Sequence, residues 1–181
     1  MVISGYEHNA VTRPLAALKA KVSVAGGPLF DQEAAIRAFD ELIAPGVDVV
    51  ICNHVSNVFG FVQPVEKVAA LCRSRGVPLI VDASQSAGIL PINMKSLGAA
   101  YIAMPGHKGL YGPQHRRALV RGRSDPKTAA GGRHGEYFSQ SGDAGLPAGP
   151  HRGRDHNMPG IAGLLAGIRF VRDRDTGHFA P

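Results

Sequence analysis

A regular alternation of short apolar runs and helical patterns over residues 1–114 is the feature that most constrains the fold. Residues 47–52 (VDVVIC) and 78–81 (PLIV) have the continuous apolarity of strands that are covered on both faces. Between them, residues 64–76 begin with a proline, end with a glycine and carry apolar side chains at the spacing of one helix face. A strand, a helix and a second strand in this order indicate two parallel strands of one sheet.

Two further elements extend this series. Residues 31–43 have the pattern of a helix whose buried face carries Ile36, Phe39 and Ile43. Residues 101–104 (YIAM) form another short apolar run, which predicts a further strand. The sequence therefore predicts an α/β fold with a mainly parallel sheet flanked by helices.

Residues 115–155 depart from this pattern. They are rich in Gly, Arg, Ala and Pro, and apart from 118–120 (ALV) they show no sustained helix or strand period. They hold eight Lys and Arg residues against four Asp and Glu residues, which accounts for four of the chain's six net positive charges. Because the segment lacks interleaved aromatic side chains, it is interpreted as solvated or mistranslated and not as a nucleic-acid-binding arm.

Helical order is predicted to return in the last segment, residues 156–181. Ile161, Leu164, Leu165 and Ile168 have the spacing of one apolar helix face. The chain therefore divides into three segments, 1–114, 115–155 and 156–181.

The sequence also predicts a cytoplasmic protein that has no membrane partner. No apolar run approaches the roughly 20 residues of a membrane span, and the N-terminus lacks the charged start and apolar core of a signal peptide. Cys52 and Cys72 have no CxxC spacing, so we expect reduced core residues, with no disulfide and no metal site.

Four polar clusters fall at or near the ends of predicted strands. They are residues 7–9 (EHN), 53–57 (NHVSN), 82–85 (DASQ) and 106–109 (GHKG). In an open parallel sheet, ligands bind beyond the carboxyl ends of the strands. Four clusters at one edge of the sheet therefore predict a polar site that holds one ligand.

The side chains in these clusters suit pyridoxal 5′-phosphate (PLP). Its aldehyde needs a lysine amine, which Lys108 offers, and its ring nitrogen needs a carboxylate, which Asp82 offers. Gln85 and Asn57 are candidates to donate hydrogen bonds to the phenolic oxygen of the ring, and His107 is a candidate to reach the phosphate.

Each of these residues also has a simpler interpretation when it is taken alone. Lys108 has the features of a solvated surface lysine, Asp82 and His8 of helix caps, Asn57 of a turn residue, and Gln85 of a cap for backbone groups. The combination of a lysine, a carboxylate and two polar loops favours the cofactor site.

Three stretches together resemble a known family. They are residues 7–15 (EHNAVTRPL), 54–88 (from HVSNVFG to DASQSAG) and 104–114 (MPGHKGLYGPQ). They resemble the class V aminotransferase family, in particular its cysteine-desulfurase-like branch. The resemblance covers almost all of residues 1–114 and implies the major domain of a fold-type I PLP enzyme, in which Lys108 forms a Schiff base and Asp82 pairs with the pyridine nitrogen.

The resemblance also implies roles for the other residues. It places His8 on the cofactor ring, Asn57 and Gln85 by the phenolic oxygen, and His107 by the phosphate. It implies an amino-acid substrate, with cysteine as a candidate, a homodimeric parent protein, and Lys108 as the base that removes the α-proton.

The chain departs from the family in several places. The family's phosphate-binding loop is expected upstream of residue 2, and its substrate-binding arginine and nucleophilic cysteine are expected beyond residue 181, so an incomplete chain is expected. Neither Cys52 nor Cys72 lies where the family has its nucleophile.

Residues 115–155 bear no likeness to the family's continuation. They are interpreted as a stretch in a shifted reading frame, because a GC-rich gene read out of frame gives Arg, Gly, Ala and Pro. Three hypotheses stay open: a PLP-dependent enzyme, a non-catalytic remnant of one, and a basic nucleic-acid-binding protein.

Overall fold

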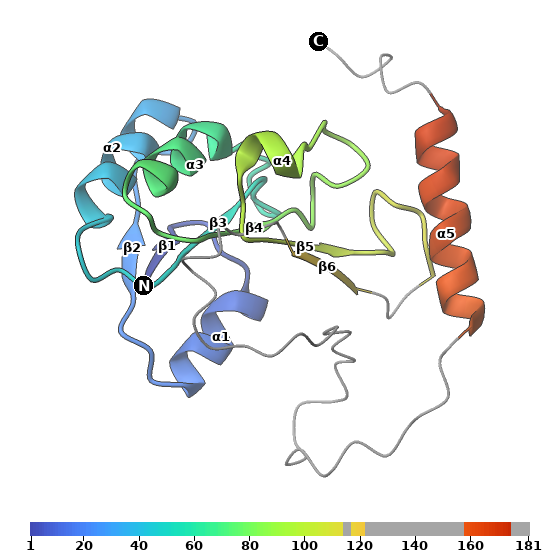
Figure 1. Ribbon diagram of the computed structural model, residues 1–181, viewed down its shortest axis with the longest axis horizontal. Coiled ribbons are helices and arrows are strands. Elements are labelled where there is room, and N and C mark those ends of the chain that lie inside the picture. The colour runs from blue at the N-terminus through green and yellow to red at the C-terminus, as the bar shows by residue number, and fades with distance from the viewer. Residues whose placement is uncertain (114–116, 122–157, 175–181) are drawn as a thin grey trace.

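A six-stranded sheet in the order β2-β1-β3-β4-β5-β6 organises the fold (Figure 1). The computed structural model describes residues 1–113, 117–121 and 158–174. Strands β1 to β5 are parallel and β6 is antiparallel to β5. The strands are β1 (Val2–Ser4), β2 (Ser23–Ala25), β3 (Val50–Asn53), β4 (Leu79–Asp82), β5 (Tyr101–Pro105) and β6 (Arg117–Arg121). The predicted mainly parallel α/β fold is confirmed.

Helices lie on both faces of this sheet. They are α1 (Asn9–Ala17), α2 (Gln32–Leu42), α3 (Val65–Ser74), α4 (Met94–Leu97) and α5 (Met158–Asp173). In Figure 1, α2, α3 and α4 cover one face, α1 lies on the opposite face, and α5 stands beyond the edge formed by β5 and β6. The described helices are all too short or too polar to cross a membrane.

The main core lies between the sheet and helices α2 and α3. Phe39 of α2 and Val68 of α3 are completely buried, and they pack in one cluster with Val50 and Val81 of the central strands. The predicted faces of both helices are confirmed, although Ile36 is only half-buried. Each burial removes a large apolar surface from water and so stabilises the fold.

The two cysteines belong to this core. Cys52 and Cys72 are both buried and both are free thiols. Their predicted place in the core is confirmed.

The second face of the sheet is less covered than the sequence predicts. Ile51 and Ile80 are only half-buried, whereas their neighbours Val50 and Leu79 are buried. The physical reason is that α1, the helix on this face, buries none of its own residues. An unbroken apolar run therefore does not guarantee two covered faces.

The structure adds elements that the sequence pattern does not reveal. Strand β2 is three residues long and two of them are exposed, so it lacks an apolar period. Strand β6 pairs with β5 through residues 117–121, beyond the predicted end of the first segment at residue 114. The other residues of the predicted segment 115–155, and those from 175 onward, lie outside the described residues.

Helix α5 confirms the predicted helix but corrects its buried face. Ile161, Leu165 and Ile168 are 44%, 47% and 42% exposed, whereas Leu164, the fourth residue of the predicted face, is half-buried. The helix instead turns Gly163 and Gly167 towards residues 110–113. The reason is steric, because only residues without a Cβ allow the helix to come this close to another backbone.

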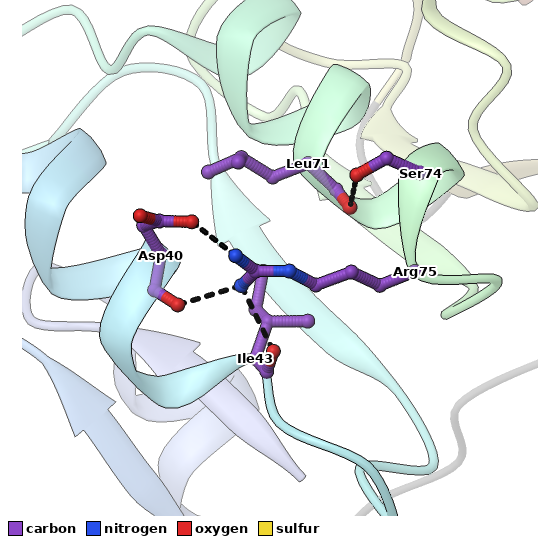
Figure 2. Close-up of polar contacts among 5 residues, drawn as sticks. All are labelled: Asp40, Ile43, Leu71, Ser74 and Arg75. Atoms are coloured by element: carbon purple, nitrogen blue, oxygen red, sulfur yellow. Dashed lines mark hydrogen bonds and ion pairs between the residues drawn. The ribbon is translucent and has the colours of Figure 1, made fainter.

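An arginine at the end of α3 joins the two main helices (Figure 2). The guanidinium of Arg75 donates to the carbonyl oxygens of Asp40 and Ile43, at 2.6 and 2.9 Å, and it forms an ion pair with the Asp40 carboxylate. These carbonyls belong to the last turn of α2, where backbone oxygens lack partners within the helix. A cation at this end of a helix is also favoured by the helix dipole.

We expect Arg75→Ala to lower the free energy of unfolding by about 1–2 kcal/mol, because the carbonyls and the carboxylate lose a charged donor. The matched control is Lys67→Ala, which breaks the ion pair with Glu33 between the same two helices, where both side chains are well exposed. We expect this control to cost less than about 0.5 kcal/mol. Urea unfolding of the three proteins measures both values, and equal effects would contradict the capping role.

Candidate functional site

A polar pocket lies at the carboxyl ends of the parallel strands. The parallel register places Asn53 of β3 opposite Asp82 of β4, and Asp82 opposite Ala103 of β5. The pocket is lined by His8, Asn53, Val55, Asn57, Asp82, Ser84, Gln85 and Lys108. It lies where the strand order reverses around β1, which is the usual ligand position in such sheets.

Five of the six residues predicted for the cofactor site line this one pocket. They are His8, Asn57, Asp82, Gln85 and Lys108. The sixth, His107, is exposed and is not among the lining residues. The individual roles of all six stay predictions.

Sequence reasoning did not single out three of the lining residues. Asn53 and Val55 belong to the predicted cluster at residues 53–57, and Ser84 belongs to the cluster at 82–85. The signal was therefore present in their positions, but an amide, an apolar side chain and a hydroxyl have no chemistry specific enough to distinguish them.

His8 both caps a helix and lines the pocket. Its Nδ1 accepts a hydrogen bond of 3.0 Å from the backbone N–H of Ala10 at the start of α1. Because Nδ1 is an acceptor, the neutral ring carries its proton on Nε2. The cap thus fixes the ring at the pocket, and the two interpretations of His8 are compatible.

Asp82 ends β4 with one carboxylate oxygen engaged. Its Oδ1 accepts a hydrogen bond of 2.9 Å from the backbone N–H of Ser84, which holds the side chain in a local turn. Within the described part of the chain, its Oδ2 has no hydrogen-bond partner, and neither has the side-chain amine of Lys108. A free carboxylate oxygen and a free amine on one pocket fit the ring nitrogen and the aldehyde of PLP.

Two glycines bring the lysine loop, residues 106–113, against the loop that follows β4. A Cβ added to Gly88 would lie 2.2 Å from the carbonyl oxygen of Gly109, and a Cβ added to Gly109 would lie 2.2 Å from that of Ala87. Gly88 also has a φ of +82°, which disfavours any other residue. This close approach sets the position of Lys108 relative to Asp82 and Gln85.

A buried carboxyl group, that of Glu7, ties the end of β1 to the end of β3. Its Oε1 accepts hydrogen bonds from Ser4 Oγ at 2.6 Å and from the backbone N–H of Asn53 at 2.7 Å. The Asn53 side chain in turn donates to the carbonyl oxygen of Tyr6 at 2.9 Å. Glu7 lies beside His8 in the predicted cluster, and that position was the only sequence signal for its role.

The pKa of Glu7 is raised to about 7, mainly by burial and to a smaller extent by the nearby negative charge of Asp82, while the hydrogen bonds from Ser4 and Asn53 oppose the shift. Its Oε2 is buried and lacks a partner in the described residues. Glu7 therefore changes protonation state near neutral pH, next to the pocket.

The thiols of Cys52 and Cys72 have raised pKa values, whereas a reactive cysteine has a lowered one. Burial raises the pKa of Cys72 to about 11 and that of Cys52 well above its ordinary value. Neither residue lines the pocket. Since the thiolate is the nucleophilic form, neither cysteine is suited to attack a substrate there.

Glu7 generates a pH prediction for stability. Its pKa is higher in the folded chain than the ordinary 4.5, so the folded state binds the extra proton and stability falls as pH rises between these two values. We expect wild type to lose up to about 3 kcal/mol relative to Glu7→Gln between about pH 5 and pH 8. Urea unfolding across this range measures it.

The control for this prediction is Glu33→Gln, because Glu33 is an exposed carboxylate in α2. It should leave the pH dependence of wild type unchanged. Parallel pH profiles for wild type and Glu7→Gln would show that the Glu7 carboxyl group does not titrate as described.

Comparison with known proteins adds to this geometry. The profile of the family Aminotransferase class-V matches residues 1–177. A probable cysteine desulfurase of Xylella fastidiosa (strain Temecula1) is 34% identical over 141 residues, which are 75% of this chain and 33% of that protein. The cysteine desulfurase IscS of Pectobacterium carotovorum is 44% identical over a shorter stretch of 71 residues, which are 39% of this chain and 17% of that protein.

Solved structures agree with the sequence relatives. The apo cysteine desulfurase of Thermococcus onnurineus NA1 superposes with a TM-score of 0.69 at 26% identity, over 97% of this chain and 46% of that one. The cysteine desulfurase CsdA of Escherichia coli gives 0.68 at 25% identity, over 97% and 46%. The chain thus spans about half the length of these structures and a third of the Xylella relative. Since the family profile matches nearly the whole chain, this chain belongs to the class V aminotransferase family.

Proposed function

We propose that this chain carries the PLP-binding core of an enzyme that acts on an amino acid, of the cysteine desulfurase type within its family. One observation carries the proposal: Lys108 and Asp82 line the same pocket, each with a free polar atom among the described residues. Related proteins named as cysteine desulfurases support the same assignment.

Lys108 and Asp82 have complementary tasks in this proposal. When bound, PLP withdraws electrons from the α-carbon of an amino acid, which makes the α-proton removable. Lys108 would hold the cofactor through its aldehyde, and its amine, when free, would be the base that takes the α-proton. Asp82 would keep the ring nitrogen protonated, and its Oδ2 is available for this because Oδ1 already accepts from the Ser84 N–H.

The other side chains orient the ring. His8 would stack on the ring, and the helix cap at its Nδ1 holds the imidazole at the pocket. Asn57 and Gln85 lie on the pocket wall, where their amides can donate to the phenolic oxygen. We assign the phosphate to His107, which is exposed beyond the lining residues.

We further propose cysteine as the substrate, a homodimer as the active form and the cytoplasm as the location. The substrate rests on the names of the relatives, and the location rests on the composition of the chain. The positive charge of residues 115–155 is not assigned a nucleic-acid partner.

The test is covalent labelling at Lys108. Adding PLP to wild type should give a visible absorbance band, and reduction with borohydride should leave a modification on Lys108 that peptide mass spectrometry locates. Lys108→Ala should lose both signals because it lacks the amine. Lys95→Ala changes an exposed lysine of α4 outside the pocket, so it should keep both.

Asp82→Asn extends this test to the ring nitrogen. Loss of a charged hydrogen-bond partner should weaken PLP binding by roughly tenfold or more while Lys108 still becomes labelled. If folded wild type gives no band and no labelled lysine, the proposal fails and the chain is a non-catalytic remnant of the family.

A further inference from the structure

Two segments contact the backbone of the lysine loop: the loop after β4 and helix α5. Only the first of them belongs to the site described above. On one side Gly109 contacts Ala87 and Gly88 of the loop after β4. On the other side stands α5, which Figure 1 shows next to this loop. A Cβ added to Gly167 of α5 would lie 2.1 Å from the carbonyl oxygen of Leu110.

The contact between α5 and the loop is closest at Gly167, which is buried. The same added Cβ would lie 3.0 Å from the carbonyl carbon of Tyr111 and 3.1 Å from the nitrogen of Gly112. All three neighbouring atoms are backbone atoms, which cannot swing aside as the end of a side chain can. One helix turn away, Gly163 meets only the ring of Pro113.

The loop itself is strained at the point where α5 touches it. Tyr111 has a φ of 52°, in the left-handed region that residues with a Cβ rarely adopt. The Tyr111 N–H donates to the carbonyl oxygen of Lys108 at 2.9 Å, and the Gly112 N–H donates to that of Gly106 at 2.6 Å. Such a conformation persists only when its surroundings hold it in place.

Helix α5 supplies a second contact to the strained residue. The Tyr111 ring meets the Phe170 ring edge to face, with centroids 5.5 Å apart. Gly167 and Phe170 are three residues apart, so they lie on neighbouring positions of the helix surface. Gly167 and Phe170 thus contact Leu110 and Tyr111, two consecutive residues of the loop that also carries Lys108.

The glycine at position 167 indicates that the close approach of α5 to the loop is functionally important. Glycine inside a helix is less favourable than alanine, so nothing in the helix itself favours it. Its value lies in the close approach of α5 to the loop. By contrast, Ile161, Leu165 and Ile168 of the same helix are more than 40% exposed.

We propose that Gly167 is a positioning residue for Lys108: it seats α5 on the backbone of residues 110–112, and so fixes the strained loop that presents the lysine to the pocket. The inference rests on the proposed function for the role of Lys108. It adds that α5, which contributes no residue to the pocket lining, is part of the lysine's support.

The experiment compares Gly167→Ala with two controls in the full chain. Leu165→Ala changes the outward face of the same helix, where Leu165 is 47% exposed. Gly26→Ala adds a methyl group where nothing lies within 4 Å. Two quantities are measured: hydrogen exchange of the amides of residues 109–112, and borohydride-trapped PLP on Lys108 relative to labelling of Lys95 by an amine reagent.

We expect Gly167→Ala to speed the exchange of these amides, and to lower trapping at Lys108, each by roughly tenfold. Lys95 labelling should not change, because Lys95 lies outside the lysine loop. A change at both lysines would instead indicate a general loss of structure. Both controls should resemble wild type. If Gly167→Ala fails to fold, Phe170→Ala replaces it, since this exposed ring can be removed without adding atoms, and it should act in the same direction.

The outcomes separate the two proposals. If wild type is labelled at Lys108 and Gly167→Ala behaves as the controls do, the positioning role is overturned and the proposed function stands. If wild type is not labelled, the proposed function fails, and amide exchange alone decides whether α5 holds the loop. Unchanged exchange in both Gly167→Ala and Phe170→Ala would overturn the inference in either case.

Discussion

Parallel pairing of β1, β3, β4 and β5 is the constraint on which the rest of the structure depends. Parallel strands end at one edge, so the segments that follow them converge there although they lie far apart in sequence. The helix after β1 lies on one face of the sheet, and those after β3 and β4 lie on the other (Figure 1), so the chain leaves this edge in opposite directions. The pocket, with Asp82 and Lys108 in its lining, lies among these converging loops.

Burial decides the chemistry of groups that look alike in sequence. Glu7 and Asp82 both lie at strand ends. Glu7 accepts hydrogen bonds from Ser4 and Asn53 and has a pKa raised to about 7, whereas one carboxylate oxygen of Asp82 has no partner among the described residues. The thiols of Cys52 and Cys72 are buried and remain protonated. Desolvation thus separates structural groups from the groups available to a ligand.

Close backbone contacts hold the lysine loop, residues 106–113, on two sides. Gly88 and Gly109 on one side, and Gly167 on the other, let three segments approach more closely than residues with a Cβ permit. These contacts explain how an exposed lysine obtains a defined position without an ion pair among the described residues. They also indicate that α5 supports the lysine loop, a role that its exposed apolar residues Ile161, Leu165 and Ile168 do not suggest.

The sequence by itself determined the parallel α/β fold, the helices that bury Phe39 and Val68, and the strand-end positions of His8, Asn57, Asp82, Gln85 and Lys108. These follow from local apolar periods and from the rule that parallel strands end together. Only the tertiary structure decided that the Glu7 carboxyl group is desolvated, that β2 and β6 join the sheet, that His107 lies outside the pocket lining, and that α5 packs through its glycines. The reason is that desolvation, strand pairing and backbone approach depend on residues distant in sequence, which no local pattern records.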